Sequence, residues 1–286
     1  MKKLTLVLLV LSLMVGVFAS CGKQSAQITV VTREEGSGTR SAFVELIGVM
    51  VEKDGEEVDG ITKAAVQQKS TSTVRTTVAG DKNAIGYISL GALDDSVKAI
   101  QVDGVEATVD NILNGQYKVA RPFNIVTKGE ADEGLEADFI RFIMSADGQK
   151  ILTDEGYISA DTNAVAYVKN EEGFTGKLTI GGSTSVGPIM LKLTEAYGKL
   201  YPKVEFDVQQ NGSSTGISDA VNGNVDIGMA SREVKDSELA EGLISTTIAR
   251  DGIAVIVNLE STVESLTAEQ IKSIYLGEIT SWDEIN

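Results

Sequence analysis

The 286-residue chain contains no histidine and a single cysteine, Cys21. Without an imidazole base, the hydrolase mechanisms that pair histidine with a serine or cysteine nucleophile are excluded. One cysteine cannot form a disulfide within the chain, and no histidine and cysteine cluster has the spacing of metal ligands. The nucleotide-binding pattern GxxxxGK[ST] is also absent. We therefore expect a protein that is not an enzyme and that holds neither a metal nor a cofactor.

Aromatic residues and positive charge are both scarce. Aromatic side chains make up 5% of the chain, and 25 Lys and Arg stand against 41 Asp and Glu, which gives a formal charge of −16. Such a surface repels nucleic acid and offers few rings for base stacking, so nucleic acid is not an expected partner. An anionic ligand has to be held by local dipoles and hydrogen bonds, because the overall field opposes it. The length suits two domains.

The N-terminus is typical of an exported lipoprotein. Lys2 and Lys3 precede an apolar run at residues 4–18, which is shorter than the roughly 20 residues that span a bilayer. Residues 1–20 are therefore predicted to be a signal peptide. The Phe-Ala-Ser-Cys sequence that ends at Cys21 resembles a bacterial lipobox, so we expect a lipid on Cys21, a tether at residues 21–26 and attachment to the outer face of the cell membrane. The alternative is an ordinary cleavage site beside an incidental cysteine.

Three loops rich in glycine and hydroxyl residues follow predicted strands and precede predicted helices. They lie within residues 30–43, 181–188 and 211–216. Such a junction directs free backbone N–H groups and the positive end of a helix dipole at one point, where an anion can bind. Each loop alone could be a turn with a helix cap. Three of them favour one shared small anion. A fourth hydroxyl-rich stretch, residues 70–75, is interpreted mainly as a helix cap.

The remaining pattern alternates strands with amphipathic helices, which is typical of an α/β fold. Proline marks residues 119–123 as an edge segment, and the apolar run at residues 253–257 predicts a central strand. Other expected elements are a strand at 27–32, a helix after Thr39, a solvated connection at 52–60, a strand at 83–90, a helix at 135–153 and a linker at 160–176.

With the three loops, residues 84–89 and residues 276–282, the chain resembles the PstS-like phosphate-binding lipoproteins of ABC phosphate importers. The resemblance covers essentially everything after the tether. The order of the segments differs, however. In that family the Gly-Ser-Thr-Ser loop comes first, and the Arg-x-x-Gly-Ser-Gly-Thr segment follows the Ser-Trp-Asp segment. Here the later half stands first, so the sequence resembles a circular permutant in which residues 160–176 join the usual ends.

The resemblance implies a circularly permuted, two-lobed type II periplasmic-binding-protein fold with a ligand cleft between the lobes. One lobe is expected to contain residues 27–85 and 258–286, and the other residues 86–257. It implies a monomer that closes around inorganic phosphate and delivers it to an ABC permease. A segment-swapped dimer, or a piece of a longer protein, is the alternative for the permuted chain.

The resemblance also implies a set of phosphate-binding residues. The chain departs from the family pattern at one position. Some members have an aspartate there that accepts the proton of the ligand, and this chain has Ser231. Glu35 is then the candidate acceptor, while Arg232 is expected to be a surface or inter-lobe charge. Two alternatives to a phosphate transport receptor stay open. One is a receptor for another tetrahedral oxyanion such as sulfate, and the other is a phosphate-sensing surface protein without a transporter. The implied set is Arg33, Glu35, Ser37, Gly38, Thr39, Thr184, Ser185, Ser213 and Ser231.

Overall fold

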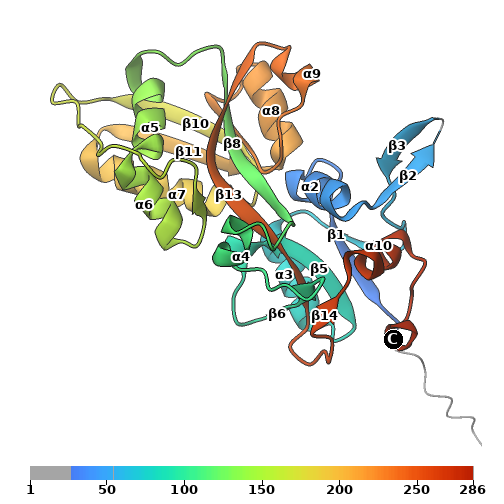
Figure 1. Ribbon diagram of the computed structural model, residues 1–286. Coiled ribbons are helices and arrows are strands. Elements are labelled where there is room, and N and C mark those ends of the chain that lie inside the picture. Colours follow the sequence, from blue (N-terminus) through green and yellow to red (C-terminus); the bar gives the residue numbers. More distant parts are fainter. Residues whose placement is uncertain (1–26, 54, 286) are drawn as a thin grey trace, which may run out of the picture.

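The computed structural model describes residues 27–53 and 55–285 of the chain. Two lobes lie side by side and share one ten-stranded sheet, in the order β11-β10-β12-β8-β13-β5-β1-β4 with short β6 and β9 against β13 (Figure 1). We call residues 27–119 and 253–285 the terminal lobe and residues 123–249 the central lobe. The predicted signal peptide and the lipid on Cys21 fall outside the described residues.

The terminal lobe places its part of the sheet between two apolar layers. On one side Phe43 stacks on Tyr87 with ring centroids 4.0 Å apart, and on the other Val74 and Val78 pack against Ile88. Its main elements are β1 (Thr29–Arg33), α2 (Gly38–Ile47), β4 (Val66–Gln68), α3 (Thr71–Gly80), β5 (Ala84–Ser89) and α10 (Ala268–Leu276). Smaller elements are β2 (Met50–Lys53), β3 (Glu56–Asp59), η1 (Leu90–Ala92), β6 (Lys98–Ala99), β7 (Gln101–Val102), α4 (Val109–Leu113), β14 (Ser265–Leu266) and η2 (Trp282–Glu284).

The central lobe is built in the same way, with a parallel group of strands covered by helices on both faces. The predicted helix at residues 135–153 is two helices, because Ser145 ends the first and its side chain caps the second by accepting from the Gly148 N–H at 3.3 Å. The elements are β8 (Ala120–Lys128), α5 (Gly134–Met144), α6 (Ala146–Asp154), β9 (Ile158–Ser159), β10 (Gly176–Gly182), α7 (Gly187–Leu200), β11 (Val204–Gln210), α8 (Ser213–Val221), β12 (Ile227–Ala230), α9 (Asp236–Leu239) and β13 (Leu243–Val257).

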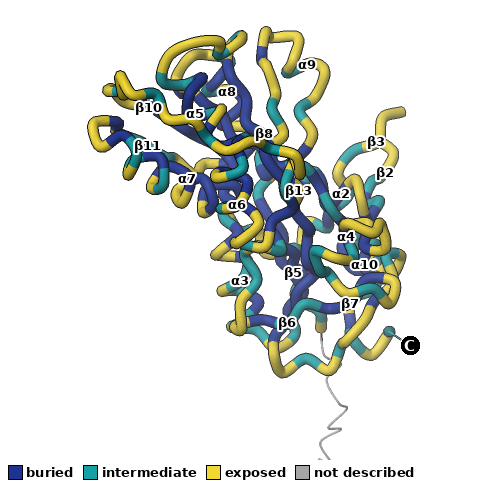
Figure 2. The backbone as a smooth tube through the Cα atoms, turned by 60° about the vertical axis from the view of Figure 1, so that its left-hand side comes forward, coloured by how far each residue is buried: buried dark blue, intermediate teal, exposed yellow. Residues whose placement is uncertain are grey.

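Two long antiparallel strands, β8 and β13, carry the chain from one lobe into the other. Figure 2 shows them, with β5, as a buried band through the middle of the molecule. Phe123 packs into the central core and Ile253 into the terminal core, so the crossings lie at residues 120–122 and 250–252. The lobe boundaries expected at 85/86 and 257/258 do not match these crossings. An apolar run predicts a buried strand, but it does not tell which core the strand enters.

Residues 119–123 are an edge only locally. At Pro122 the strand β8 pairs with β13 on one side, and its pairing with β12 begins at Asn124. The missing N–H of proline is tolerated where one side of a strand is unpaired. Beyond that point β8 is a central strand.

Residues 50–59 differ from the predicted solvated connection, because they form a β-hairpin in which β2 pairs with β3. The predicted linker, by contrast, has neither helix nor strand between Ser159 and Gly176. It is held on the central lobe by Tyr167 and Asn170, which both bond the Tyr201 hydroxyl, at 2.9 and 2.7 Å.

The first and last described segments lie side by side. Gln27 forms an isolated antiparallel bridge with Ser281, and the Ile28 N–H donates to the Thr280 carbonyl at 2.8 Å. Next to them, the Trp282 indole donates to the Asn83 carbonyl at 3.0 Å. Both ends of the described chain are therefore tied to the terminal lobe.

Candidate anion-binding site

Buried hydroxyl groups of the two lobes meet at one place, which we call the hydroxyl cluster. The Thr39 hydroxyl lies 2.9 Å from that of Ser185, and the Thr71 hydroxyl lies 3.0 Å from the same atom. Each of these bonds joins the terminal lobe to the central lobe. Every member of the cluster is at most 5% exposed. The members are Thr39 and Thr71 of the terminal lobe and Thr184, Ser185, Ser213 and Ser231 of the central lobe.

The loops that carry these hydroxyls owe their positions to helix starts. Ser37 caps α2, where its side chain accepts from the Arg40 N–H at 3.3 Å, and Ser70 caps α3 in a capping box. Helix α8 begins at Ser213 itself. The free N–H groups and the positive dipole ends of α2, α3 and α8 therefore come with the hydroxyls, which suits a bound anion.

Arg33 brings the positive charge to the cluster. It ends β1, is 2% exposed, and donates from Nη1 to the Thr71 hydroxyl at 3.3 Å. Its other edge is held by Glu34, which accepts from Nε at 2.8 Å and from Nη2 at 2.7 Å. A guanidinium has five N–H donors, so this pair leaves donors of Nη1 and Nη2 for a ligand. Glu34 thus fixes the plane in which Arg33 presents them.

Tyr87 supports the end of β1 beneath Arg33. Its hydroxyl accepts from the Arg33 backbone N–H at 3.2 Å and lies 2.7 Å from the Thr32 hydroxyl. Burial raises the pKa of Tyr87 to about 12, so the phenol stays neutral in the physiological range. The phenol therefore adds no negative charge beneath a site built for an anion.

Two charged side chains considered from the sequence lie elsewhere. Glu35 is exposed, because β1 ends at Arg33 and the alternation of a strand does not continue to it. The prediction that Glu35 shares a face with Arg33 is therefore wrong, and the neighbouring carboxylate is Glu34. Arg232 is bound by Glu238 through two bonds of 2.7 and 2.8 Å, within the central lobe.

Thr71 was not among the site residues derived from the sequence. The sequence feature that could have indicated Thr71 is the hydroxyl-rich stretch at residues 70–75. As predicted, this stretch caps a helix, because Ser70 caps α3. The next residue after that cap is the one that reaches Thr184 and Ser185 across the lobes. A cap and a contact residue can therefore share one short segment.

Gly38 allows the close approach between the lobes. A Cβ built on it would lie 2.4 Å from the Ser213 hydroxyl oxygen and 2.9 Å from that of Ser231. Any side chain at this position would collide with the central lobe. The backbone of α2 thus comes directly against Ser213 at the start of α8 and Ser231 after β12.

Behind the cluster, Arg121 and Asp251 form an ion pair whose side chains are each 1% exposed. Arg121 donates from Nη2 to Asp251 at 3.2 Å and from Nη1 to the Ser231 carbonyl at 3.0 Å. Burial lowers the pKa of Arg121 and raises that of Asp251, while each partially offsets the effect on the other. No motif in the sequence pointed to this pair.

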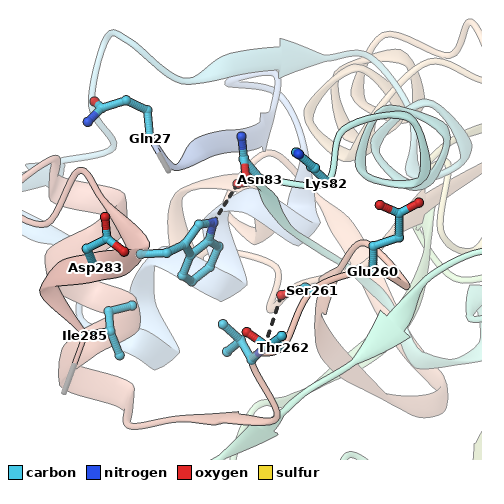
Figure 3. A pocket seen from close by; sticks show the side chains of 10 residues that line it. Gln27, Lys82, Asn83, Glu260, Ser261, Thr262, Asp283 and Ile285 are labelled. Atoms are coloured by element: carbon cyan, nitrogen blue, oxygen red, sulfur yellow. Dashed lines mark hydrogen bonds between the residues drawn. The ribbon is translucent and has the colours of Figure 1, made fainter. Parts of the chain in front are cut away.

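A cavity in the described part of the chain lies away from the hydroxyl cluster. It has a volume of about 870 Å³ and opens beside the chain ends, between Gln27, Asn83 and Trp282 (Figure 3). None of its lining residues belongs to the hydroxyl cluster, whose groups bond one another. Within residues 27–53 and 55–285, no three acidic, cysteine or histidine side chains gather as metal ligands would. Over the same residues, no helix is long and apolar enough to cross a membrane.

The chain matches the model of the PBP superfamily domain over residues 17–147 and 167–285. It is 47% identical over 278 residues to the phosphate-binding protein PstS 2 of Streptococcus agalactiae, an alignment that covers 95% of this chain and 94% of the other. It is 39% identical to the phosphate-binding protein PstS of Bacillus subtilis over 140 residues, which is 48% of this chain and 43% of the other.

A solved structure gives the same result. The crystal structure of a phosphate ABC transporter phosphate-binding protein from Streptococcus pneumoniae is 43% identical, covers 91% of this chain and 100% of its own, and superposes with a TM-score of 0.72. The similarity therefore extends over both lobes. From these matches, the chain belongs to the PBP superfamily and, within it, to the PstS phosphate-binding proteins.

Proposed function

We propose that the protein captures inorganic phosphate between its lobes on the extracytoplasmic side of the membrane and delivers it to an ABC importer. The observation that carries this proposal is the hydroxyl cluster, in which buried hydroxyls of both lobes meet and one of them, Thr71, accepts from Nη1 of Arg33. Its relatives named as phosphate-binding proteins support the choice of ligand. Chemical conversion is not part of the proposal.

Lobe closure follows from how the donors are divided. Thr39 and Thr71 belong to one lobe and Ser185 to the other, so the full set of donors exists only when the lobes meet. A ligand that binds the donors of both lobes has a higher affinity for the closed arrangement than for the open one, and it therefore stabilises the closed arrangement. About eight donors at roughly 1.5–3 kcal/mol each exceed the ~8 kcal/mol of a micromolar complex, and the surplus offsets desolvation and closure.

The cluster favours an oxyanion more clearly than it selects phosphate over sulfate. Its members are hydroxyls, which can donate or accept. By the family resemblance, Ser231 stands where some members have an aspartate. A carboxylate would accept the proton of hydrogen phosphate and repel sulfate. A receptor for another tetrahedral oxyanion is therefore the second candidate.

Calorimetric titration of the full chain, purified in detergent, tests both. We expect one phosphate per chain and weaker binding of sulfate. Equal affinities would assign the protein to oxyanions in general, and the absence of phosphate binding by a folded chain would refute the proposal. Phosphate uptake by membrane vesicles that contain the importer, with and without this protein, then separates a transport receptor from a sensor.

We also propose that Cys21 carries the lipid that anchors a monomer at the cell membrane. The support is the lipobox-like sequence before Cys21 and the apolar run at residues 4–18. The substitution Cys21→Ala should release the protein from the membrane fraction into the medium. In mass spectrometry, the N-terminal peptide of the variant should lack the mass of the acyl groups that the natural chain carries. Retention of the variant on the membrane would refute the anchor.

We infer further that the chain is a circular permutant of the more common order in its family. The match to the Bacillus subtilis protein covers about half of each chain. When two halves of a sequence have changed places, one collinear alignment can match only one of the halves. The ends of the described chain lie side by side, at the Gln27 and Ser281 bridge. Such adjacent ends can be joined and the chain opened elsewhere.

A chain reopened between Glu171 and Glu172, with a short glycine segment from Ile285 to Gln27, tests this inference. Both glutamates are exposed in the linker. We expect a folded protein that binds phosphate with an affinity within about threefold of the natural order, because the lobes keep their contacts. Loss of folding would contradict the inference.

A further inference from the structure

Arg121 and Asp251 face each other where the two crossing strands pass between the lobes. They are register partners in β8 and β13, and their side chains form the buried ion pair described above. Two charges lose their hydration in such a pair, so it adds little net stability compared with apolar residues. The pair lies at the crossing, where Arg121 also contacts the hydroxyl cluster.

Arg121 holds the backbone that follows β12 at Ser231, a member of the hydroxyl cluster. Its Nη1 donates to the Ser231 carbonyl at 3.0 Å. The following carbonyl, that of Arg232, accepts from Asn124 of the same strand at 2.9 Å, and Thr247 of β13 donates to Asn124 at 2.7 Å. Two successive peptide units after β12 are therefore held by side chains of the crossing strands.

The polar groups of Ser231 point into the cluster from this fixed backbone. Its N–H donates to the Ser213 hydroxyl at 3.2 Å, and its own hydroxyl lies 3.4 Å from the same oxygen. On the other side it lies against Gly38 at the start of α2. When two lobes close, the strands between them absorb the rotation. A residue on those strands that holds Ser231 connects the hinge with the ligand contact.

The bonding of Arg121 fits this role. Its Nε is buried and has no hydrogen-bond partner in the described structure, while both terminal nitrogens are used. The position of the Arg121 side chain therefore allows its hydrogen bonds to Ser231 and Asp251 but leaves the Nε donor without a partner. Burial of an unpaired donor is costly, which argues against a purely stabilising purpose.

We propose that Arg121 is a positioning residue, which places Ser231 for the bound anion and couples it to the hinge, and that Asp251 orients Arg121. The proposal rests on the proposed function, because it assigns a role at the same site. It adds a specific path from the crossing strands to one ligand contact.

The test uses the full chain with Arg121→Met/Asp251→Leu, which removes both charges. Apolar replacement of a buried ion pair often preserves stability, so this variant separates folding from positioning. We expect phosphate affinity to fall about 30-fold. In a Ser231→Ala background the same double change should lower affinity by less than about threefold, because residues that act through a common contact are not additive.

A matched control is Asp138→Asn in α5. Asp138 is also a buried carboxylate of the central lobe, and it accepts from Tyr197 at 2.6 Å, outside the cluster. We expect it to lower the melting temperature without changing phosphate affinity. Hydrogen exchange of the Ser231 amide is a second readout that needs no ligand, and it should accelerate about tenfold in the uncharged-pair variant but not in Asp138→Asn.

Two results would overturn the proposal. One is an uncharged-pair variant with the phosphate affinity of the natural chain, and the other is a 30-fold loss that persists in the Ser231→Ala background. If the natural chain binds no phosphate, the proposed function fails, and the exchange of the Ser231 amide still decides the positioning role. Unchanged exchange there would overturn it.

Discussion

The two lobes contribute to the candidate site in different ways. The terminal lobe brings a charged group, Arg33, whose Nη1 reaches the cluster. The central lobe brings hydroxyls, while its Arg232 is paired with Glu238. Arg121, on the crossing strand β8, is bonded to the Ser231 carbonyl and to Asp251. This division suggests that the terminal lobe supplies the charge that attracts the anion and that the central lobe completes the shell on closure.

The largest expected effect comes from removing the charge of the terminal lobe with Arg33→Met. Loss of two charge-assisted hydrogen bonds at roughly 1.5–3 kcal/mol each should weaken phosphate binding at least about 100-fold. Arg75→Met is the matched control, since Arg75 pairs with Asp94 at 3.1 Å on a partly exposed surface of the same lobe. Calorimetric titration measures both, and an unchanged affinity of Arg33→Met would remove Arg33 from the site.

An intermediate effect is expected from Gly38→Ala, which attacks the contact between the lobes. The added Cβ would meet the Ser213 hydroxyl at 2.4 Å, so the lobes could not close fully. We expect phosphate affinity to fall about 10- to 100-fold, because strain of roughly 1–3 kcal/mol opposes the closed state. Small-angle scattering with saturating phosphate should show a larger radius of gyration than that of the natural chain.

Gly36→Ala is the control for this substitution. A Cβ there would have its nearest neighbour at 3.8 Å, the Ser214 Cβ, which is an ordinary contact. We expect binding and scattering close to those of the natural chain. If Gly38→Ala behaves like Gly36→Ala, the close approach of α2 to the central lobe is not needed for binding.

The smallest effect should come from one hydroxyl of the central lobe, removed by Ser213→Ala. One hydrogen bond to a charged ligand is worth roughly 1.5–3 kcal/mol, and at the lower end of that range affinity should fall about 10-fold. Ser214→Ala is the matched control, because Ser213 is 1% exposed in the cluster while the adjacent Ser214 is exposed. Equal effects of the two substitutions would contradict the assignment of Ser213.

Local patterns in the sequence predicted the loops of the site but not all of its contacts. Strand, glycine turn and helix start are determined within a few residues, and all three predicted loops contribute to the hydroxyl cluster or its immediate contacts. The pairing of β2 with β3 also has a local signal, the sequence Asp-Gly before β3, and Gly55 has a φ of 84°, but the acidic composition of this stretch favours a solvated connection.

The choice between Glu34 and Glu35 shows where local reasoning stops. Both are adjacent to the same turn, and alternation along a strand favours Glu35 only if the strand continues. The strand β1 ends at Arg33, so Glu34 folds back onto the guanidinium and Glu35 points to solvent. The end of a strand is set by its pairing with β4 and β5, which the sequence pattern does not show.

The sequence by itself determined the family resemblance, the alternating α/β elements and the Gly/Ser/Thr loops at helix starts, because each depends on neighbouring residues. Tertiary structure alone decided where β8 and β13 cross between the lobes and that Arg121 meets Asp251, 130 positions away, as well as the Ser231 carbonyl. Such contacts depend on which surfaces pack together. The energy of that packing is distributed over both cores and has no local signature in the chain.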